Sequence, residues 1–253
     1  MFDSELKRQP QVRFLGASIS WVEFCLYLGF AGYIILFQPQ SIIPLGALII
    51  SIVCHEVAHG YAARYHGDTT AEELGRLTLN PLAHLDLVGS LLLPMLLIVT
   101  NVGFVFGWAK PVPVVANRLR NPNRNMVEVA LAGPIINIVL MMIAFVLIYI
   151  ITSFESLLYI FSTSILVGLV EFLVIFSAIN LVLAAFNMLP IPPLDGSHLL
   201  YYFLPKEYRS GFNQFKPYGF FILIILLQLN VVSSYIGYIL SHFSEIIKMI
   251  LQA

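Results

Sequence analysis

Two histidines and a glutamate lie close together in an apolar stretch of the chain, in the order His55-Glu56-x-x-His59. Residues four apart share one face of a helix, with Cβ atoms roughly 6 Å apart, so both imidazoles can bind one metal ion while Glu56 lies beside that ion's water. Zinc at such a site would lower the pKa of the water to about 7, and Glu56 would accept its proton as the hydroxide attacks a carbonyl. The pattern is short, and paired histidines on a helix also occur as ordinary hydrogen-bonding residues.

A second candidate for chemistry is the proline-rich segment at residues 187–196. Three of its prolines fall within four positions, so the segment cannot remain helical. Non-helical backbone at membrane depth is tolerated only where protein buries it or where it lines a water-filled cavity, which indicates a site. Asp195 is the expected third metal ligand, because two histidines and a carboxylate leave the fourth tetrahedral position for water. His198, three residues further on, is a competing ligand.

The composition is that of an integral membrane protein, with 59% hydrophobic and 11% charged residues. The net charge of −1 gives no indication of nucleic-acid binding, and Cys25 and Cys54 are expected to be inert thiols because both lie in apolar runs. We predict an all-α polytopic membrane protein with about five to six transmembrane segments, in a single domain over residues 1–253. Charge-poor runs long enough to cross about 30 Å of hydrocarbon lie at residues 14–37, 42–63, 87–109, 129–154, 157–194 and 217–244.

The basic residues predict the topology. The polar tail at residues 1–13 is cytosolic under the positive-inside rule, so the first helix, at about 16–37, leaves the cytosol and the second, at about 42–65, returns to it. Asp195 must lie at the depth of His59 if the two share one metal ion. The fifth segment therefore also runs towards the cytosol, which demands an odd number of crossings between the second and fifth segments.

Two apolar runs, 87–109 and 129–154, lie between those segments, so one of them fails to cross the bilayer. The first run is the better candidate for a re-entrant segment, because Gly89, Pro94 and Gly103 interrupt it. This arrangement also places every basic residue except Lys248 on the cytosolic face, which agrees with the positive-inside rule.

Smaller patterns add detail to this picture. Short β-like pieces associated with the membrane are predicted near residues 75–80 and 110–115, where alternation and prolines favour extended backbone. Small residues followed by Asn137 indicate close helix packing and an interhelical hydrogen bond. Glu171 and Asn180 are expected to pack beside hydrogen-bonding neighbours.

With both motifs in view, the chain resembles the site-2 protease family of intramembrane zinc metalloproteases. These enzymes combine HExxH on one membrane helix with an N-x-x-P-x-P-x-L-D-G segment on a later one. The shorter pieces resemble the compact bacterial and archaeal branch, and no insert long enough for a PDZ module is present. The likeness covers a motif-bearing core at about residues 45–205. The fixed positions of the second motif are occupied by Asn187, Pro190, Pro192, Leu194, Asp195 and Gly196.

The resemblance implies that His55, His59 and Asp195 bind one zinc ion, that Glu56 is the general base, and that Asn187 holds the substrate or its oxyanion. The Asn187 amide could instead only tie down the proline-rich segment. The implied activity is hydrolysis of peptide bonds in or near transmembrane segments of membrane-protein substrates. The implied location is a prokaryotic cytoplasmic membrane, with the N-terminus and the active site towards the cytosol.

Two other functions are compatible with charged residues inside a membrane. A zinc or ion transporter also uses intramembrane histidine and aspartate, but many transporters have repeated halves, and the chain contains no second HExxH and no second proline-rich segment. An inactive scaffold of protease type would be expected to lack the base or a ligand, and all of these residues are present in the sequence.

Overall fold

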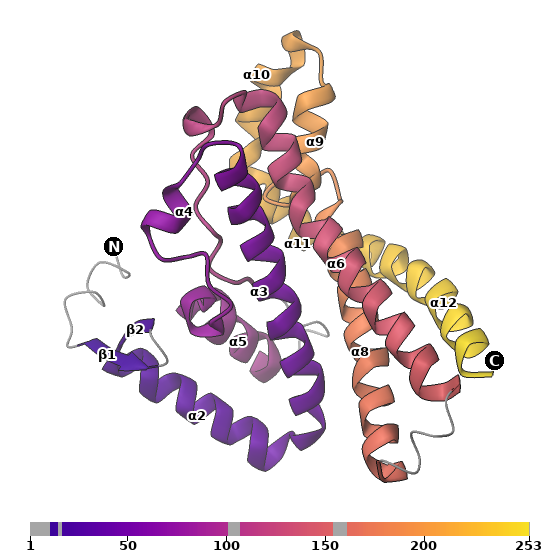
Figure 1. Cartoon of the computed structure of the whole chain (residues 1–253). Helices are drawn as coiled ribbons and strands as arrows, with labels where there is room; N and C mark the ends of the chain where they lie inside the picture. The colour runs from indigo at the N-terminus through magenta and orange to yellow at the C-terminus, as the bar shows by residue number, and fades with distance from the viewer. Residues whose placement is uncertain (1–10, 15–16, 101–106, 154–160, 253) are drawn as a thin grey trace.

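The computed structural model describes residues 11–14, 17–100, 107–153 and 161–252 (Figure 1). Within these residues, three helices are long and apolar enough to cross a membrane, and a bent helix pair near the C-terminus makes a fourth if it is one span. The chain is a helical membrane protein, as predicted, whereas the predicted count of five to six spans is not confirmed. The three long helices are α3 (Ile42–Tyr65), α6 (Pro122–Ser153) and α8 (Thr163–Asn187).

An apolar core joins the long helices. Buried side chains of α6 and α8 meet each other, one residue of α3, and the C-terminal helix α12 (Val231–Gln252). Inside a bilayer such helices are held together by close packing and by interhelical hydrogen bonds, because the surrounding lipid is as apolar as the side chains. The core therefore fixes α3, α6 and α8 relative to one another. Its buried members are Ala47, Ala144, Ile148, Leu173, Phe176, Phe243 and Ile247.

The first apolar run forms α2 (Trp21–Phe37), whose 17 residues are at the lower end of the roughly 17–25 that a membrane-spanning helix needs. A capping box fixes its start: Ser20 Oγ accepts a hydrogen bond from the Glu23 N–H at 3.2 Å, and the Ser20 N–H donates to Glu23 Oε2 at 2.8 Å. Strands β1 (Gln11–Phe14) and β2 (Ala17–Ser20) pair antiparallel before it; β1 lies mostly in the predicted polar tail, and β2 occupies the first residues of the helix predicted at about 16–37. Figure 1 shows α2 on the opposite side of α3 from α6 and α8.

The interrupted run at 87–109 is helical only in its first part, as a π-helix over Val88–Leu92 and the helix α5 over Leu93–Thr100. Together these elements extend for about 20 Å, less than the thickness of the hydrocarbon. The two ends of the run lie side by side, because the Trp108 N–H donates to Gly89 O at 3.1 Å. Ser90 Oγ also donates to Trp108 O at 2.9 Å.

The segment that follows, residues 107–115, has no regular secondary structure. No strand forms over 75–80 or 110–115, so the predicted β-like pieces are not confirmed. Side chains hold this segment instead: Arg76 Nη2 donates to Lys110 O at 2.8 Å, and the Val115 N–H donates to Asp68 Oδ2 at 2.6 Å. Three short helical elements lie before or after this segment in the chain: α4 (Thr70–Glu73), η2 (Pro81–His84) and η4 (Ala116–Arg118).

Asp68 anchors this segment to the end of α3. Its side chain is buried, and burial raises the pKa of the carboxyl, but the hydrogen bonds from the Thr70 side chain, the Val115 N–H and the Thr70 N–H outweigh burial and hold the pKa below its ordinary value. The carboxylate therefore stays charged at neutral pH and keeps accepting these bonds. The 107–115 segment is thus tied to the helix that carries His55 and His59.

The C-terminal part is a series of shorter helices: α9 (Gly196–Phe203), α10 (Lys206–Phe215), η5 (Lys216–Tyr218) and α11 (Gly219–Gln228). The apolar run at 217–244 is not one straight helix, because the chain bends by 66° between the helices that end at Gln228 and begin at Val231. Asn230 makes the bend with a φ of 59°. Asparagine is among the few non-glycine residues that adopt this left-handed conformation readily.

Candidate metal centre and active site

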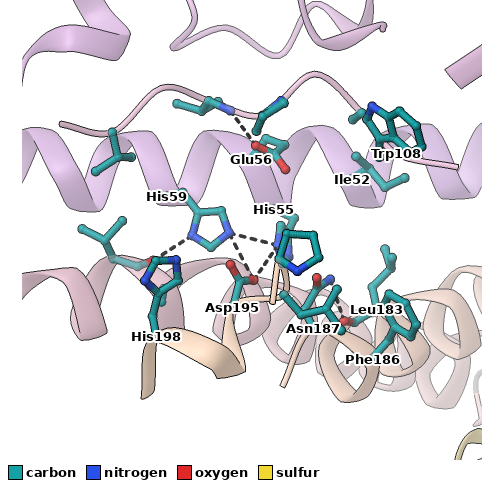
Figure 2. Close-up of a pocket in the computed structure, with 18 of the residues that line it drawn as sticks. Ile52, His55, Glu56, His59, Trp108, Leu183, Phe186, Asn187, Asp195 and His198 are labelled. Atoms are coloured by element: carbon teal, nitrogen blue, oxygen red, sulfur yellow. Dashed lines mark hydrogen bonds and ion pairs between the residues drawn. The ribbon is translucent and has the colours of Figure 1, made fainter. Parts of the chain in front are cut away.

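His55 and His59 lie one turn apart on α3 and are almost fully buried, with 6% and 8% of their surface exposed. Their Nε2 atoms are 3.0 Å apart. Asp195 Oδ2 lies 3.1 Å from Nε2 of His55 and 3.4 Å from Nε2 of His59 (Figure 2). The structure therefore brings together the three side chains that the sequence analysis predicted as metal ligands.

The other nitrogen of each ring decides which atoms carry protons. His59 Nδ1 lies 2.7 Å from Val129 O, and His55 Nδ1 lies 2.6 Å from Asn137 Oδ1. Both partners are oxygens that accept, so each Nδ1 carries the hydrogen and each Nε2 presents a lone pair. Asp195 Oδ2 is buried and receives no hydrogen bond. Three electron-pair donors thus converge with no proton between them, which is the environment of a cation.

Space beside the three donors is kept open by Gly133 of α6. A Cβ at this position would lie 2.5 Å from His59 Nε2 and from His55 Cε1. The sequence analysis interpreted the small residues of α6 as a sign of helix packing only, and the structure adds that one of them faces the two imidazoles. Two histidines and a carboxylate are a common donor set of catalytic zinc. The residues present therefore fit a zinc ion.

Asp195 reaches the histidines because the chain turns sharply after α8. That helix ends at Asn187, where the prolines begin, and α9 starts at Gly196. A Cβ on Gly196 would collide with the backbone oxygen of Met188, so only glycine allows this close return. The predicted loss of helix in the proline-rich segment is confirmed. The turn made by this segment brings the Asp195 carboxylate next to the two histidines of α3.

Glu56 lies beside the two histidines and lines the same cavity. Its Oε2 accepts a hydrogen bond from the Val112 N–H at 2.7 Å, so the carboxylate faces the 107–115 segment (Figure 2). The prolines on either side of Val112 have no N–H, and Val112 is therefore the donor that this stretch can offer. The sequence predicted that Glu56 lies on this helix, as α3 shows, but gave no sign of this partner.

The remaining candidates are less directly engaged. Asn187 Nδ2 donates to Leu183 O at 3.0 Å, within its own helix, so the bond tests neither of the two roles predicted for this amide. His198 lines the cavity but does not belong to the group of three convergent ligand atoms found among the described residues. The geometry favours Asp195 over His198 as the third ligand, and the roles of all these residues stay predictions.

A cavity of about 480 Å³ opens beside the three ligands. Most of its wall is apolar, and its few polar side chains include those of His55, His59 and Asp195. This distribution is typical of a site that binds an apolar ligand and orients it with a few polar groups. The apolar wall includes Ile52, Trp108, Leu183, Phe186 and Leu223.

Comparison with known proteins agrees with this geometry. Residues 44–230 match the sequence model of Peptidase family M50. YwhC of Bacillus subtilis, named as a candidate zinc metalloprotease, is 39% identical over 194 residues, which cover 76% of this chain and 83% of YwhC. Rip2 of Mycolicibacterium smegmatis, named in the same way, is 32% identical over 187 residues, which cover 74% of this chain and 66% of Rip2. No solved structure is significantly similar to the chain.

Proposed function

The chain belongs to peptidase family M50 and is a membrane zinc metalloprotease, and from this premise we propose that it cleaves peptide bonds in or near transmembrane segments of other membrane proteins. One observation carries the proposal: the lone pairs of His55 and His59 converge with Asp195 Oδ2 at the wall of a largely apolar cavity between membrane helices. Such a cavity suits an apolar polypeptide segment better than a soluble, polar one.

In this proposal, His55, His59 and Asp195 hold one zinc ion per chain. When bound, zinc polarises a carbonyl and makes water acidic enough to react near neutral pH. Glu56 accepts the proton of the attacking water and returns it to the amine that leaves. The Val112 N–H holds one carboxylate oxygen of Glu56 and leaves the other free for this exchange. The apolar wall binds the substrate segment and excludes bulk water.

Asn187 can take part in this scheme through its side-chain amide. Its Nδ2 donates one hydrogen to Leu183 O in the structure, and the second hydrogen of the same nitrogen can donate to a substrate oxygen. The other proposed role is that the amide only ties down the proline-rich segment that carries Asp195.

A direct test of the function reconstitutes the purified protein in lipid vesicles together with single-span membrane proteins that carry a tag at each end, and measures their cleavage. We expect two fragments whose new termini, mapped by mass spectrometry, lie in or next to the spanning segment. Removal of zinc with a chelator should stop the cleavage, and added zinc should restore it. Cuts confined to soluble parts of the substrates, or no cleavage by zinc-loaded protein, would contradict the proposal.

We also propose the orientation that the sequence analysis predicted, with the N-terminus and the metal centre towards the cytosol of a prokaryotic cell. The hydrogen bonds that join Gly89 and Ser90 to Trp108 support a re-entrant run at 87–109, because a segment whose two ends touch enters and leaves on one side. The chain then crosses the bilayer once, through α6, between α3 and α8, and Asp195 ends at the depth of His59.

Cysteine labelling in cells tests this orientation, on a background in which Cys25 and Cys54 are replaced. Reporters are placed at exposed positions: Gln40 between α2 and α3, Leu74 after α4, and Asn123 at the start of α6. An impermeant reagent added from outside is expected to label position 40 alone, and permeabilised cells should show all three. Labelling of position 123 but not 74 from outside would rule out the re-entrant run.

A further inference from the structure

A chain of fully buried polar side chains connects His55 to the other two long helices. Asn137 of α6, Asn180 of α8 and Ser51 of α3 each have 0% of their surface exposed. Asn137 Oδ1 lies 2.6 Å from His55 Nδ1, Asn137 Nδ2 donates to Asn180 Oδ1 at 2.8 Å, and Asn180 Nδ2 donates to Ser51 Oγ at 2.8 Å. The sequence analysis predicted interhelical hydrogen bonds here, and no connection to the metal centre.

The directions of the bonds in this chain follow from two backbone carbonyls. Phe176 O lies 2.9 Å from the Asn180 amide and Ser51 O lies 3.4 Å from the Asn137 amide; each carbonyl can only accept, so each amide must turn its nitrogen to it. Asn180 Oδ1 is then the atom that faces Asn137, which must present its own nitrogen. Asn137 therefore turns its oxygen to His55, and His55 Nδ1 must carry the hydrogen.

We infer that Asn137 and Asn180 are positioning residues that hold His55 in the Nδ1–H tautomer and so keep its Nε2 lone pair aimed at the metal. The inference rests on the proposed zinc site and adds to it the residues that prepare one ligand. Reversal of either amide would offer His55 Nδ1 a donor, move the ring proton to Nε2, and place it between His59 Nε2 and Asp195 Oδ2.

The two histidines differ in how they are prepared. His59 is oriented by a backbone oxygen, Val129 O, which no side-chain substitution removes. His55 depends on two side-chain amides that can each be turned either way. The shorter of the two contacts that settle their orientation, Asn180 Nδ2 to Phe176 O at 2.9 Å, lies three hydrogen bonds from His55, and the longer one is Asn137 Nδ2 to Ser51 O at 3.4 Å. Partners of metal-bound histidines fix the ring and its tautomer in this way, and their loss typically lowers metal affinity about 10- to 100-fold.

The test compares Asn137→Leu with Asn137→Asp. Leucine fills the volume but leaves His55 Nδ1 without an acceptor, so we expect zinc affinity, measured by chelator competition, to fall about 10- to 100-fold. Aspartate can still accept a hydrogen bond from His55 Nδ1, but its second carboxylate oxygen would face Asn180 Oδ1, and two acceptors repel each other. It should therefore keep zinc affinity within a few-fold of the wild type, while both variants lose thermal stability in the metal-free form.

A role limited to joining helices predicts a different result, in which both variants lose zinc affinity in proportion to their loss of stability. That result, or zinc affinity of Asn137→Leu within about twofold of the wild type, would overturn the inference. Ser177→Ala is the matched control, because Ser177 is buried on α8 and bonds only Val174 O of its own helix. It should leave zinc affinity unchanged.

A second measurement keeps the inference testable if Asn137→Leu does not fold. Histidine ¹⁵N spectra of the metal-free protein, assigned with a His55→Asn variant, should show His55 as the Nδ1–H tautomer in the wild type and as a mixture in Asn180→Ala. An unchanged tautomer in Asn180→Ala would overturn the role of Asn180 and leave Ser51 O as the group that orients Asn137. Absence of zinc binding by the wild type would contradict the proposed function instead, and the spectra would still test the tautomer.

Discussion

Glu56→Gln is expected to keep its zinc and to lose at least about 100-fold in kcat, since a general base contributes about 10²- to 10⁴-fold. Glutamine has the shape of glutamate, and its oxygen can accept the hydrogen bond from the Val112 N–H, so the 107–115 segment should stay in place. Its amide nitrogen cannot accept a proton from water. The substitution therefore removes the ability of residue 56 to accept a proton while keeping its hydrogen bond to Val112. The measurements are kcat on a single-span substrate and the zinc content of the purified variant.

Two comparisons sharpen this result. Glu72→Gln removes a carboxylate from α4 that pairs with Arg64 on the protein surface, and it should leave kcat unchanged. Glu56→Ala also frees the Val112 N–H, so it should alter substrate binding as well as kcat. Cleavage by Glu56→Gln at a rate near that of the wild type would exclude Glu56 as the base.

Much of the framework could be predicted from the sequence because the physical reasons are local. α3 occupies Ile42–Tyr65, as predicted from an apolar run that ends near charged residues. α8 ends at Asn187 because the prolines that follow cannot be helical. The meeting of His55, His59 and Asp195 was predicted from ligand chemistry, and the described structure places these atoms together. The capping box at Ser20 and Glu23 was also readable from its spacing and was missed.

Other features could not be predicted, because they depend on partners far apart in the chain. Val112 and Glu56 are 56 positions apart, and Asn180 and Ser51 are 129 apart. No periodicity in the sequence indicates such pairs, since each becomes adjacent only when α3, α6 and α8 pack. The bend at Asn230 depends on the backbone conformation of a single residue in an apolar run. The sequence thus predicted which candidate residues would lie together better than it predicted what orients them.

Gly133→Ala is expected to abolish zinc binding without unfolding the protein. The added Cβ would lie 2.5 Å from the rings of His55 and His59, closer than the 3.0 Å that real Cβ atoms respect. The ring ends are the mobile side of this contact, because the core packs the backbones of α3 and α6. The rings should therefore swing away from Asp195, so that zinc content falls from about one ion per chain to near zero and cleavage is lost with it.

The fold should survive the substitution, and this separates loss of the metal site from loss of the fold. Alanine favours a helix over glycine by about 1 kcal/mol, which offsets part of the cost of moving the rings, so metal-free Gly133→Ala should melt cooperatively at a temperature close to that of the metal-free wild type. Gly168→Ala on α8 is the matched control, since its Cβ would meet nothing within 4 Å, and it should keep both zinc and activity. A zinc-loaded, active Gly133→Ala would show that the imidazoles can accommodate the methyl group, and that the space beside Gly133 is not what the ion requires.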